Sequence, residues 1–401
     1  MPRRLLTRAL TVLKFVTPIA FLMPVSLFAD PLPYTVVGTG QTQCYDDHTS
    51  IGPPPPGAPF YGQDAQHPGH EPLYKDNSDG TVSDLNTGLM WVQARGVKMS
   101  WDDAVAGASI CRIGGYIDWR LPTIKELYSL INFTGSDGGP MREGRPFIDT
   151  QLFQFAFGDP SRGERIIDCQ DWSATEYVGK TMMFNDTIFG VNFADGRIKG
   201  YPRFDPRTNT AHRLYVRYVR GDPLYGVNKL VDNGDGTITD QSTGLMWQKA
   251  DSGSTMNWQG ALAYAHNLSL AGHNDWRMPN VKELQSIVDY TRAPAVTNSA
   301  AIDPIFSVSN IESYFWSSTT HLTGPPQMQG NAAAYVAFGR ALGYMQAPPM
   351  SGGMREMDVH GAGAQRSDPK DGDPSEFPYG RGPQGDDIRI FNYVRCVRSA
   401  E

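Results

Sequence analysis

The chain has 401 residues, of which 40% are hydrophobic and 19% charged, and its formal net charge is −7 at pH 7. This length is enough for two domains that each bury a core. Nucleic-acid binding proteins present a basic surface, so the acidic balance argues against a nucleic-acid partner. The 42 glycines and 30 prolines predict many turns and long structured loops.

Residues 1–29 have the pattern of a secretory signal peptide. Four basic residues come first, and an apolar run from Phe15 to Phe28 follows. The run is short for a bilayer span, and cleavage after Ala29 would leave no transmembrane segment; an uncleaved anchor is the alternative. Loss of the four basic residues would make the mature chain still more acidic. We therefore expect an exported protein.

Residues 30–73 form a proline-rich leader, in which Pro53 to Pro56 require an extended chain. We expect the leader to lie over the domain that follows it or to tether the protein to a partner. His67, His70 and Glu71 have side chains that bind metals, but next to proline and glycine they are more typical of an exposed linker.

The rest of the chain contains one stretch twice, as repeat 1 (residues 74–222) and repeat 2 (residues 226–401). Both copies contain, in the same order, the motifs Thr-Gly-Leu-Met-Trp, Asp-Trp-Arg-(Leu/Met)-Pro, Lys-Glu-Leu, Trp-Ser-(Ala/Ser)-Thr and Val-Arg-x-Val-Arg. The period of about 157 residues is that of a whole domain, well beyond the repeats of a solenoid. The chain is therefore a tandem duplication.

The sequence of each repeat predicts a β-hairpin followed by two helices and then by strands. The Asn-Ser-Asp-Gly and Asn-Gly-Asp-Gly segments favour hairpin turns, and the spacing of their acids does not fit an EF-hand loop. Helices are expected from Trp101 and Trp258, and again after Pro122 and Pro279. The second pair of helices begins with capping-box spacing, in Thr123 with Glu126 and in Asn280 with Glu283.

Eight side chains of these motifs are interpreted as structural. The tryptophans are expected in the core, and each arginine is expected to pair with a carboxylate at the start of the second helix. These residues are Trp91, Trp119, Arg120, Trp172, Trp247, Trp276, Arg277 and Trp316.

The ordered motifs resemble the Lcl C-terminal domain family, named after the C-terminal domain of the Legionella collagen-like adhesin. The resemblance covers both repeats, from about residue 74 to residue 398. It implies a bacterial, extracytoplasmic module with a C-type-lectin-like fold and, for its namesake, binding of sulfated glycans; it implies no reaction. The expected fold class is α+β: two tandem C-type-lectin-like domains, each with a β-hairpin, two helices and a small antiparallel sheet with long loops.

The four cysteines predict disulfides in an exported chain, although four allow three pairings. The resemblance implies a bond between a cysteine of the first helix and that of Arg-Cys-Val-Arg. Neither repeat can form it, because Cys111 lies in repeat 1 and Cys396 in repeat 2. We predict a Cys111–Cys169 bond, with Cys44 and Cys396 left as the uncertain pair.

Residues 345–388 of repeat 2 form a long insertion that repeat 1 lacks. A structureless loop of this length is usually functional or disordered, and the resemblance places ligand and calcium binding in this region. Carboxylates are suitable calcium ligands. If the site is here, deleting residues 352–382 should abolish binding and leave the thermal transition of repeat 1 unchanged. The candidate ligand-binding residues are Asp358, His360, Arg366, Asp368 and Lys370.

A second candidate is a basic strip near the end of repeat 1, suited to an anionic group; a solvated loop is the alternative interpretation. Its residues are Arg197, Lys199, Arg203, Arg207 and Arg213.

The chain lacks a nucleophile elbow, a His-Glu-x-x-His motif, a P-loop and a dinucleotide fingerprint. We expect a binding or adhesion protein, not an enzyme, that is periplasmic, on the cell surface or secreted. Its partner is expected to be a glycan or an envelope or surface protein, with no required cofactor and calcium as the candidate ion. The alternatives are an extracytoplasmic enzyme with an active site built from loops, and an envelope scaffold protein.

Overall fold

The computed structural model describes residues 32–139, 142–205, 208–347 and 352–400. Leu32–Glu401 forms one compact unit. The expected signal peptide, residues 1–29, lies outside the described residues. Within the described ranges, no helix is both long and apolar enough to cross a membrane.

Both repeats contain the same elements in the same order, which makes the protein a mixed α+β fold built from two tandem copies. Repeat 1 contains β3 (Tyr74–Asp76), β4 (Thr81–Asp84), β5 (Met90–Val92), α1 (Trp101–Ile110), α2 (Ile124–Ser129), β6 (Asp171–Glu176), β7 (Thr187–Asn192), β8 (Arg197–Pro202) and β9 (Val219–Arg220).

Repeat 2 has a counterpart for each of these elements and three additional ones. The counterparts are β10 (Leu230–Asp232), β11 (Thr237–Asp240), β12 (Leu245–Gln248), α3 (Trp258–Asn267), α4 (Val281–Ser286), β13 (Tyr314–His321), β14 (Ala332–Ala337), β17 (Gln365–Pro369) and β18 (Val397–Ser399). The additional elements are α5 (Pro294–Thr297), β15 (Leu342–Ala347) and β16 (Gly353–Asp358).

The first and last strands of each repeat share a small antiparallel sheet, ordered β3-β4-β5-β9 in repeat 1 and β10-β11-β12-β18 in repeat 2. Its hairpin turns are held by side chains within the turn. The Asn77 amide donates to the Thr81 hydroxyl at 2.9 Å, and Asn233 donates to Thr237 at 2.8 Å. Gly80 has a φ of +86°, which an L side chain rarely adopts. These segments are therefore turns.

The second helix of each repeat begins with the capping box that the sequence predicts. The N3 glutamate also accepts two hydrogen bonds from the arginine of the Trp-Arg-(Leu/Met)-Pro motif. Arg120 and Glu126 make contacts of 2.6 and 2.5 Å, and Arg277 and Glu283 make contacts of 2.7 and 2.6 Å. This paired geometry fixes the direction in which the chain enters the helix.

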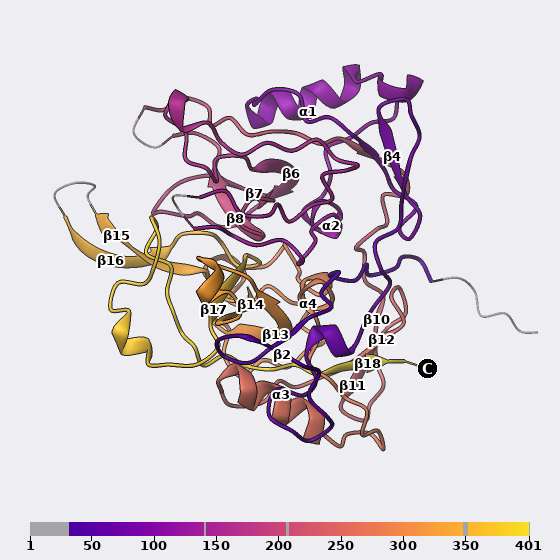
Figure 1. The fold of residues 1–401 in the computed structure, drawn as a ribbon, viewed down its shortest axis with the longest axis vertical. Coiled ribbons are helices and arrows are strands. Elements are labelled where there is room, and N and C mark those ends of the chain that lie inside the picture. The colour runs from indigo at the N-terminus through magenta and orange to yellow at the C-terminus, as the bar shows by residue number, and fades with distance from the viewer. Residues whose placement is uncertain (1–31, 140–141, 206–207, 348–351, 401) are drawn as a thin grey trace, which may run out of the picture. The chain divides into compact units, whose positions relative to one another are not determined.

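A six-stranded sheet, ordered β13-β14-β17-β8-β7-β6, joins the two repeats. Figure 1 shows these strands between α1 and α3. Each repeat contributes three strands, and the central pair is β8 with β17, where Gln365 lies opposite Ile198. Because β8 and β17 are counterparts, the two halves of the sheet are related by a pseudo-two-fold axis between these strands.

Two corresponding lysines make a second junction with the same symmetry. Lys125 Nζ of repeat 1 donates to the Ser286 carbonyl at 2.6 Å, and Lys282 Nζ of repeat 2 donates to the Ser129 carbonyl at 2.8 Å. Ser129 and Ser286 also occupy corresponding positions. Each repeat therefore holds the end of the other's second helix.

Buried side chains of both repeats belong to a shared hydrophobic cluster, which includes Trp91 with Val82 and Trp247 with Ile238. All six tryptophans interpreted as structural are buried, namely Trp91, Trp119, Trp172, Trp247, Trp276 and Trp316.

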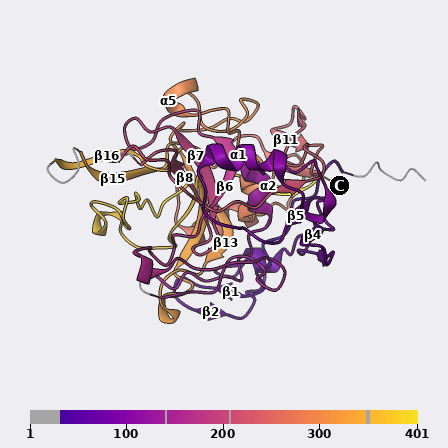
Figure 2. The ribbon, with the colours of Figure 1, turned by 90° about the horizontal axis from the view of Figure 1, so that it is seen from above.

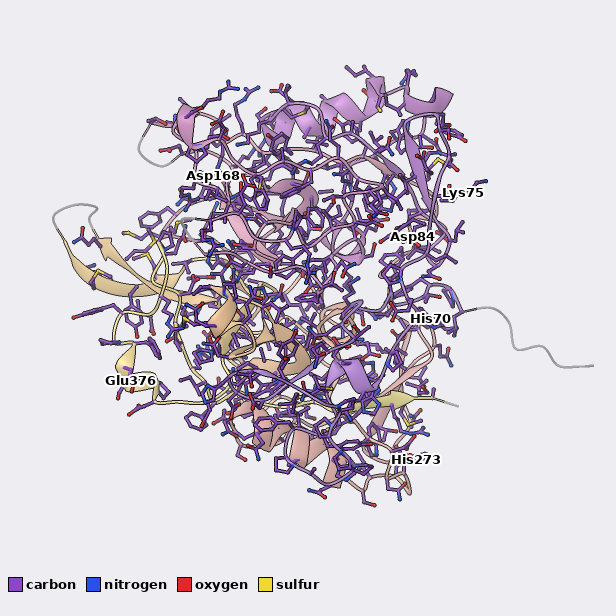
Figure 3. All side chains as sticks on the ribbon, viewed as in Figure 1. His70, Lys75, Asp84, Asp168, His273 and Glu376 are labelled. Carbon is purple, nitrogen blue, oxygen red and sulfur yellow. The ribbon has the colours of Figure 1, made fainter. Side chains whose placement is uncertain are left out.

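The leader includes β1 (Cys44–Tyr45), β2 (Ser50–Ile51) and a 3-10 turn, η1 (Asp64–Gln66). It was expected to lie over repeat 1 or to tether the protein to a partner, and in the structure it contacts both repeats. The Gln41 side chain exchanges two 2.9 Å hydrogen bonds with the backbone of Thr320 in β13. Phe133 of repeat 1 donates its backbone N–H to the Thr39 carbonyl at 2.8 Å. In Figure 3, His70 at the end of the leader lies between Asp84 of repeat 1 and His273 of repeat 2.

The insertion in repeat 2 is not a structureless loop, contrary to the sequence-based expectation. It contains most of the hairpin β15–β16, then β17 and a 3-10 turn, η5 (Pro374–Glu376). Figure 2 shows the hairpin projecting from the other strands. The chain becomes ordered because β17 finds hydrogen-bonding neighbours on both sides, β14 and β8.

Candidate functional site

The five residues proposed for a ligand-binding loop are buried and have partners within the protein. Asp358 accepts hydrogen bonds from the Tyr177 hydroxyl at 2.7 Å and from the Gly361 N–H at 2.8 Å. Burial raises its pKa to about 6. His360 Nε2 lies 2.9 Å from Asp386 Oδ1. These two side chains hold the base of the insertion and do not form an open site.

The other three residues of that set lie on or next to β17. Arg366 forms an ion pair with Asp386. Asp368 accepts from the backbone N–H groups of Arg389 and Ile390 at 3.1 and 3.2 Å. Lys370 Nζ lies 4.0 Å from the centre of the Trp258 ring and donates to the Asp46 carbonyl at 2.8 Å. Arg366 and Asp368 therefore lie on a strand and not in the predicted loop. Arg366 faces repeat 1 across the β8–β17 pair, whereas Asp368 and Lys370 contact repeat 2 and the leader.

The described residues of the basic strip have partners within the protein, and only its first two members are largely covered: Lys199 is buried and Arg197 is half-buried, whereas Arg213 is exposed. Arg203 pairs with Asp102 and lies over the Trp101 ring at 5.0 Å. Arg213 donates to the Lys98 carbonyl at 3.2 Å. Arg197 and Lys199 both pair with Asp195. Arg207 lies outside the described residues.

Parts of the two predicted sets meet at the pseudo-two-fold axis, in what we call the seam cluster: Asp195, Arg197, Lys199, His360, Arg366 and Asp386. Arg197 and Arg366 are opposite each other in the β8–β17 register, which extends from the pair Ile198 and Gln365. Burial lowers the pKa of Lys199 to about 8, and burial together with the nearby Arg197 lowers that of Arg366 to about 10. The carboxylates of Asp195 and Asp386 balance part of the positive charge of Arg197, Lys199 and Arg366. The ion pairs of the cluster form within each repeat, and Asp195 of repeat 1 also interacts electrostatically with Arg366 of repeat 2.

No disulfide is present among the described residues, since Cys44, Cys111, Cys169 and Cys396 are all free. The predicted Cys111–Cys169 bond is therefore absent. Cys111 is the C-cap residue of α1, whereas Cys169 is buried with its sulfur 3.7 Å from Asn192 Oδ1. The two thiols lie in different environments.

A cavity of about 200 Å³ lies between the leader and the outer face of α3. We call it the leader–α3 cavity; it is lined by leader residues 57–61 and by Gln259, Ala263, His266 and Asn267. The Tyr61 and His266 rings meet edge to face, with centroids 4.9 Å apart. Gln259 and Asn267 lie two helical turns apart on the same side of α3.

Phe60 anchors the leader beside this cavity. Its ring lies 6.4 Å from that of Trp258, and its carbonyl accepts from the Gln63 amide at 2.9 Å. Its φ is +65°, a conformation that costs a non-glycine residue about 1–3 kcal/mol and is often found at ligand sites. The neighbouring contacts hold the chain in this shape, which places Tyr61 next to His266.

The lining of the cavity is suited to an uncharged polar ligand. It contains no Lys, Arg, Asp or Glu. Among the described residues, the side chains of Gln259, His266 and Asn267 have no hydrogen-bond partner. Amide side chains both donate and accept hydrogen bonds, and an aromatic ring packs against apolar C–H groups. The cavity therefore offers one apolar wall and several free hydrogen-bonding groups.

Sequence reasoning did not find this cavity, because its two walls are far apart in the chain. The available signals were local: two aromatic residues after the proline run, and polar residues spaced on one face of the helix. Neither signal indicates that the leader packs on repeat 2 as well as on repeat 1. Within the described ranges, no group of three or more His, Cys, Asp or Glu side chains is arranged to hold a metal ion.

The Lcl C-terminal domain matches the chain twice, at residues 80–220 and 236–354. The two matches cover more than half of the chain, so the protein belongs to the Lcl C-terminal domain family, as the motifs predicted. The second match ends within β16, but the strands that follow it pair as their counterparts do: β18 joins β12 as β9 joins β5. No curated protein and no solved structure matches the chain.

Proposed function

We propose that the protein is an exported, adhesion-type binding protein that recognises an uncharged glycan in the leader–α3 cavity and does not transform it. The observation that carries the proposal is the lining of this cavity, with the Tyr61 ring beside the amides of Gln259 and Asn267. A sugar has an apolar C–H face and a rim of hydroxyl groups. Its face packs on the ring, and its hydroxyls bind the amides and the imidazole.

Membership of the Lcl C-terminal domain family supports a role outside the cytoplasm. The signal pattern of residues 1–29 is consistent with export. We further propose that each repeat has a C-type-lectin-like topology. In support, the first and last strands of each repeat lie in one small sheet, and long connections lie between the helices and that sheet.

The charge of the cavity favours a neutral glycan over the sulfated glycans that the family resemblance implies. Sulfate groups bind most strongly to Arg and Lys side chains, and none lines the cavity. The net charge of −7 also opposes a polyanion. Binding should therefore change little between low and high salt, whereas a polyanion binder would lose affinity steeply.

The test is a screen of neutral and sulfated oligosaccharides with the mature protein, with and without calcium, followed by calorimetric titration of each hit. We expect neutral sugars to bind, and Gln259→Ala to weaken binding by roughly tenfold, the loss of one or two hydrogen bonds. Gln151→Ala, at an exposed position of repeat 1, is the matched control. Binding of sulfated sugars alone, or equal affinity in both variants, would remove the cavity as the site.

The two alternatives make different predictions for the same samples. An enzyme would return an altered oligosaccharide, which mass spectrometry of the recovered ligand would detect. An envelope scaffold protein would bind none of the sugars and would instead bind another protein.

A further inference from the structure

The two corresponding helices α1 and α3 have different surroundings. On α3, the leader covers Trp258 with Phe60, and Gly62 lies against Leu262, where an added Cβ would be 3.9 Å from its side chain. Leu262 is consequently 2% exposed. On α1, the corresponding Val105 is 45% exposed. Figure 1 shows the indigo leader beside α3, with α1 at the other end of the six-stranded sheet.

Beneath this difference the two surfaces are built alike. The Trp101 indole donates to the Ser173 carbonyl at 2.9 Å, and the Trp258 indole donates to the Ser317 carbonyl at 2.8 Å. Each ring is also covered by a cation from the corresponding strand end: Arg203 lies 5.0 Å from Trp101, and Lys370 lies 4.0 Å from Trp258. The surface of α1 therefore has the same tryptophan and cation arrangement that the leader packs against on α3.

A threonine at the N-terminus of each second helix, α2 and α4, completes the correspondence. Thr175 accepts the N–H of Ile124 at 2.9 Å, as Thr319 accepts that of Val281 at 3.0 Å. The Thr319 hydroxyl then donates to Asp64 of the leader at 2.5 Å. Within the ranges that the structure describes, the Thr175 hydroxyl has no such acceptor.

We propose that the outer face of α1 is a docking surface for an extended, proline-containing peptide segment of a partner protein, held in repeat 1 as the leader is held in repeat 2. The face consists of Trp101, Val105, Ala106, Ser109 and Ile110. Val105 and Ile110 are 45% and 76% exposed, so two large apolar side chains lie open on this face. The chain's own leader is already engaged on α3.

The leader shows what the partner segment must supply. The partner segment needs an aromatic residue, a glycine two positions later and a carboxylate two positions after that, as in Phe60, Gly62 and Asp64 of the leader. On α1 these residues pack on Trp101, pass over Val105 and accept a hydrogen bond from Thr175. An extended proline-rich segment is partly ordered before binding, which reduces the entropy that binding costs.

Charge distinguishes the partner segment from the leader. The first turn of α1 carries Asp102, which pairs with Arg203, and Asp103, which has no ion-pair partner among the described residues; α3 has Gln259 and Gly260 there. Residues 52–67 of the leader contain no Lys or Arg. The α1 face therefore selects a segment with a basic side chain near its prolines, and this part of the binding weakens with salt.

The test is a calorimetric titration of the mature protein with a synthetic peptide of residues 52–67 that carries Ala58→Lys. We expect one peptide to bind per chain. Val105→Asp should weaken binding roughly tenfold or more, because the peptide would bury an unpaired carboxylate. Val296→Asp, at a 56% exposed valine of α5, is the matched control and should change nothing. The peptide of unchanged sequence should bind more weakly than the Ala58→Lys peptide at low salt.

Absence of saturable binding would overturn the proposal, and so would equal affinity of the wild type and Val105→Asp. Sedimentation velocity over a range of concentrations tests the other source of a leader-like segment. If the protein self-associates and Val105→Asp returns it to a monomer, the occupant is the leader of a second copy, and the proposal of a separate partner is wrong. A Phe60→Ala peptide that binds as well as its parent would also overturn it.

Discussion

Lys282 is buried and Lys125 is half-buried, and the hydrogen-bond partners of both lysines at the junction are oxygens with no formal charge. Each donates to a carbonyl of the other repeat, at 2.6 and 2.8 Å. Burial lowers the pKa of Lys125 to about 8 and that of Lys282 to about 7. In the unfolded chain the pKa of a lysine is about 10.4. Between these values the unfolded state binds more protons than the folded state, so the free energy of unfolding rises with pH.

We expect Lys282→Met to remove its part of this rise. Urea denaturation between pH 6 and 10 gives the free energy of unfolding at each pH. Above pH 7 this free energy should rise more steeply in the wild type than in Lys282→Met, by up to about 1.4 kcal/mol per pH unit. Below pH 7 the lysine is charged in both states, so the difference between the two proteins should be constant. Lys229→Met, at an exposed position, is the control and should keep the wild-type slope. Parallel slopes for Lys282→Met would contradict the assigned shift.

The thiols differ in accessibility, which a labelling experiment can detect. Cys44, Cys169 and Cys396 are buried, and burial raises the pKa of each thiol, to about 12 for Cys169. The thiolate is the reactive form. We expect a thiol reagent to modify Cys111 alone in the native protein and the other three only in denaturant. Peptide mapping without a reductant that finds Cys111 joined to any other cysteine would contradict this.

Strand β17 connects the insertion of repeat 2 to the sheet that both repeats share. It pairs with β14 of repeat 2 and β8 of repeat 1, and it places Arg366 where the two repeats meet. A deletion of residues 352–382 removes all of β17 together with β16. On the sequence alone this deletion was expected to leave repeat 1 unaffected. The structure changes that expectation, because β8 of repeat 1 would lose its neighbour.

We now expect the deletion to lower the melting temperature of the whole protein by roughly 10 °C or more. Loss of a buried ion pair alone costs about 3–5 kcal/mol, and each kcal/mol shifts the melting temperature of a domain of this size by about 2–4 °C. The matched control removes only the hairpin. Gly343 and Met357 are cross-strand partners, so an Asn-Gly turn can replace the residues between them. Calorimetry should show little change for this control; a large loss there, or none in the deletion, would refute the role given to β17.

The elements that the sequence predicted are those fixed by neighbouring residues. The hairpin turns, the capping boxes and the Arg–Glu pair before each second helix all depend on residues within a few positions of one another. The unpredicted features depend on contacts between distant segments. The pairing of Gln365 with Ile198 and the packing of Phe60 on Trp258 have no local signal. For this reason the repeats were found but their common sheet was not, and Arg366 and Asp368 were assigned to a loop instead of to β17.

At the scale of the whole molecule, the two repeats pack together like the two subunits of a dimer, but within one chain. The two copies share a sheet, a reciprocal lysine junction and a hydrophobic cluster. The leader binds both copies and covers a helix of only one. The symmetric parts of the protein therefore hold the repeats together, and the leader and the β15–β16 hairpin, which have no counterpart, make their surfaces different. One surface forms the leader–α3 cavity, and its counterpart is the open face of α1.

This arrangement predicts that the two repeats unfold together. Val82 and Ile238 occupy corresponding positions, and both are fully buried in the shared cluster. Truncating a buried isoleucine to alanine costs about 2–5 kcal/mol, so Ile238→Ala should lower the melting temperature clearly, and Val82→Ala should do so by less. In both variants, calorimetry should show a single transition that moves as a whole, with far-UV circular dichroism and tryptophan fluorescence changing at the same temperature. Independent domains would give two transitions, with each substitution moving only the transition of its own repeat. That result would show that the seam cluster and the two lysines do not couple the repeats.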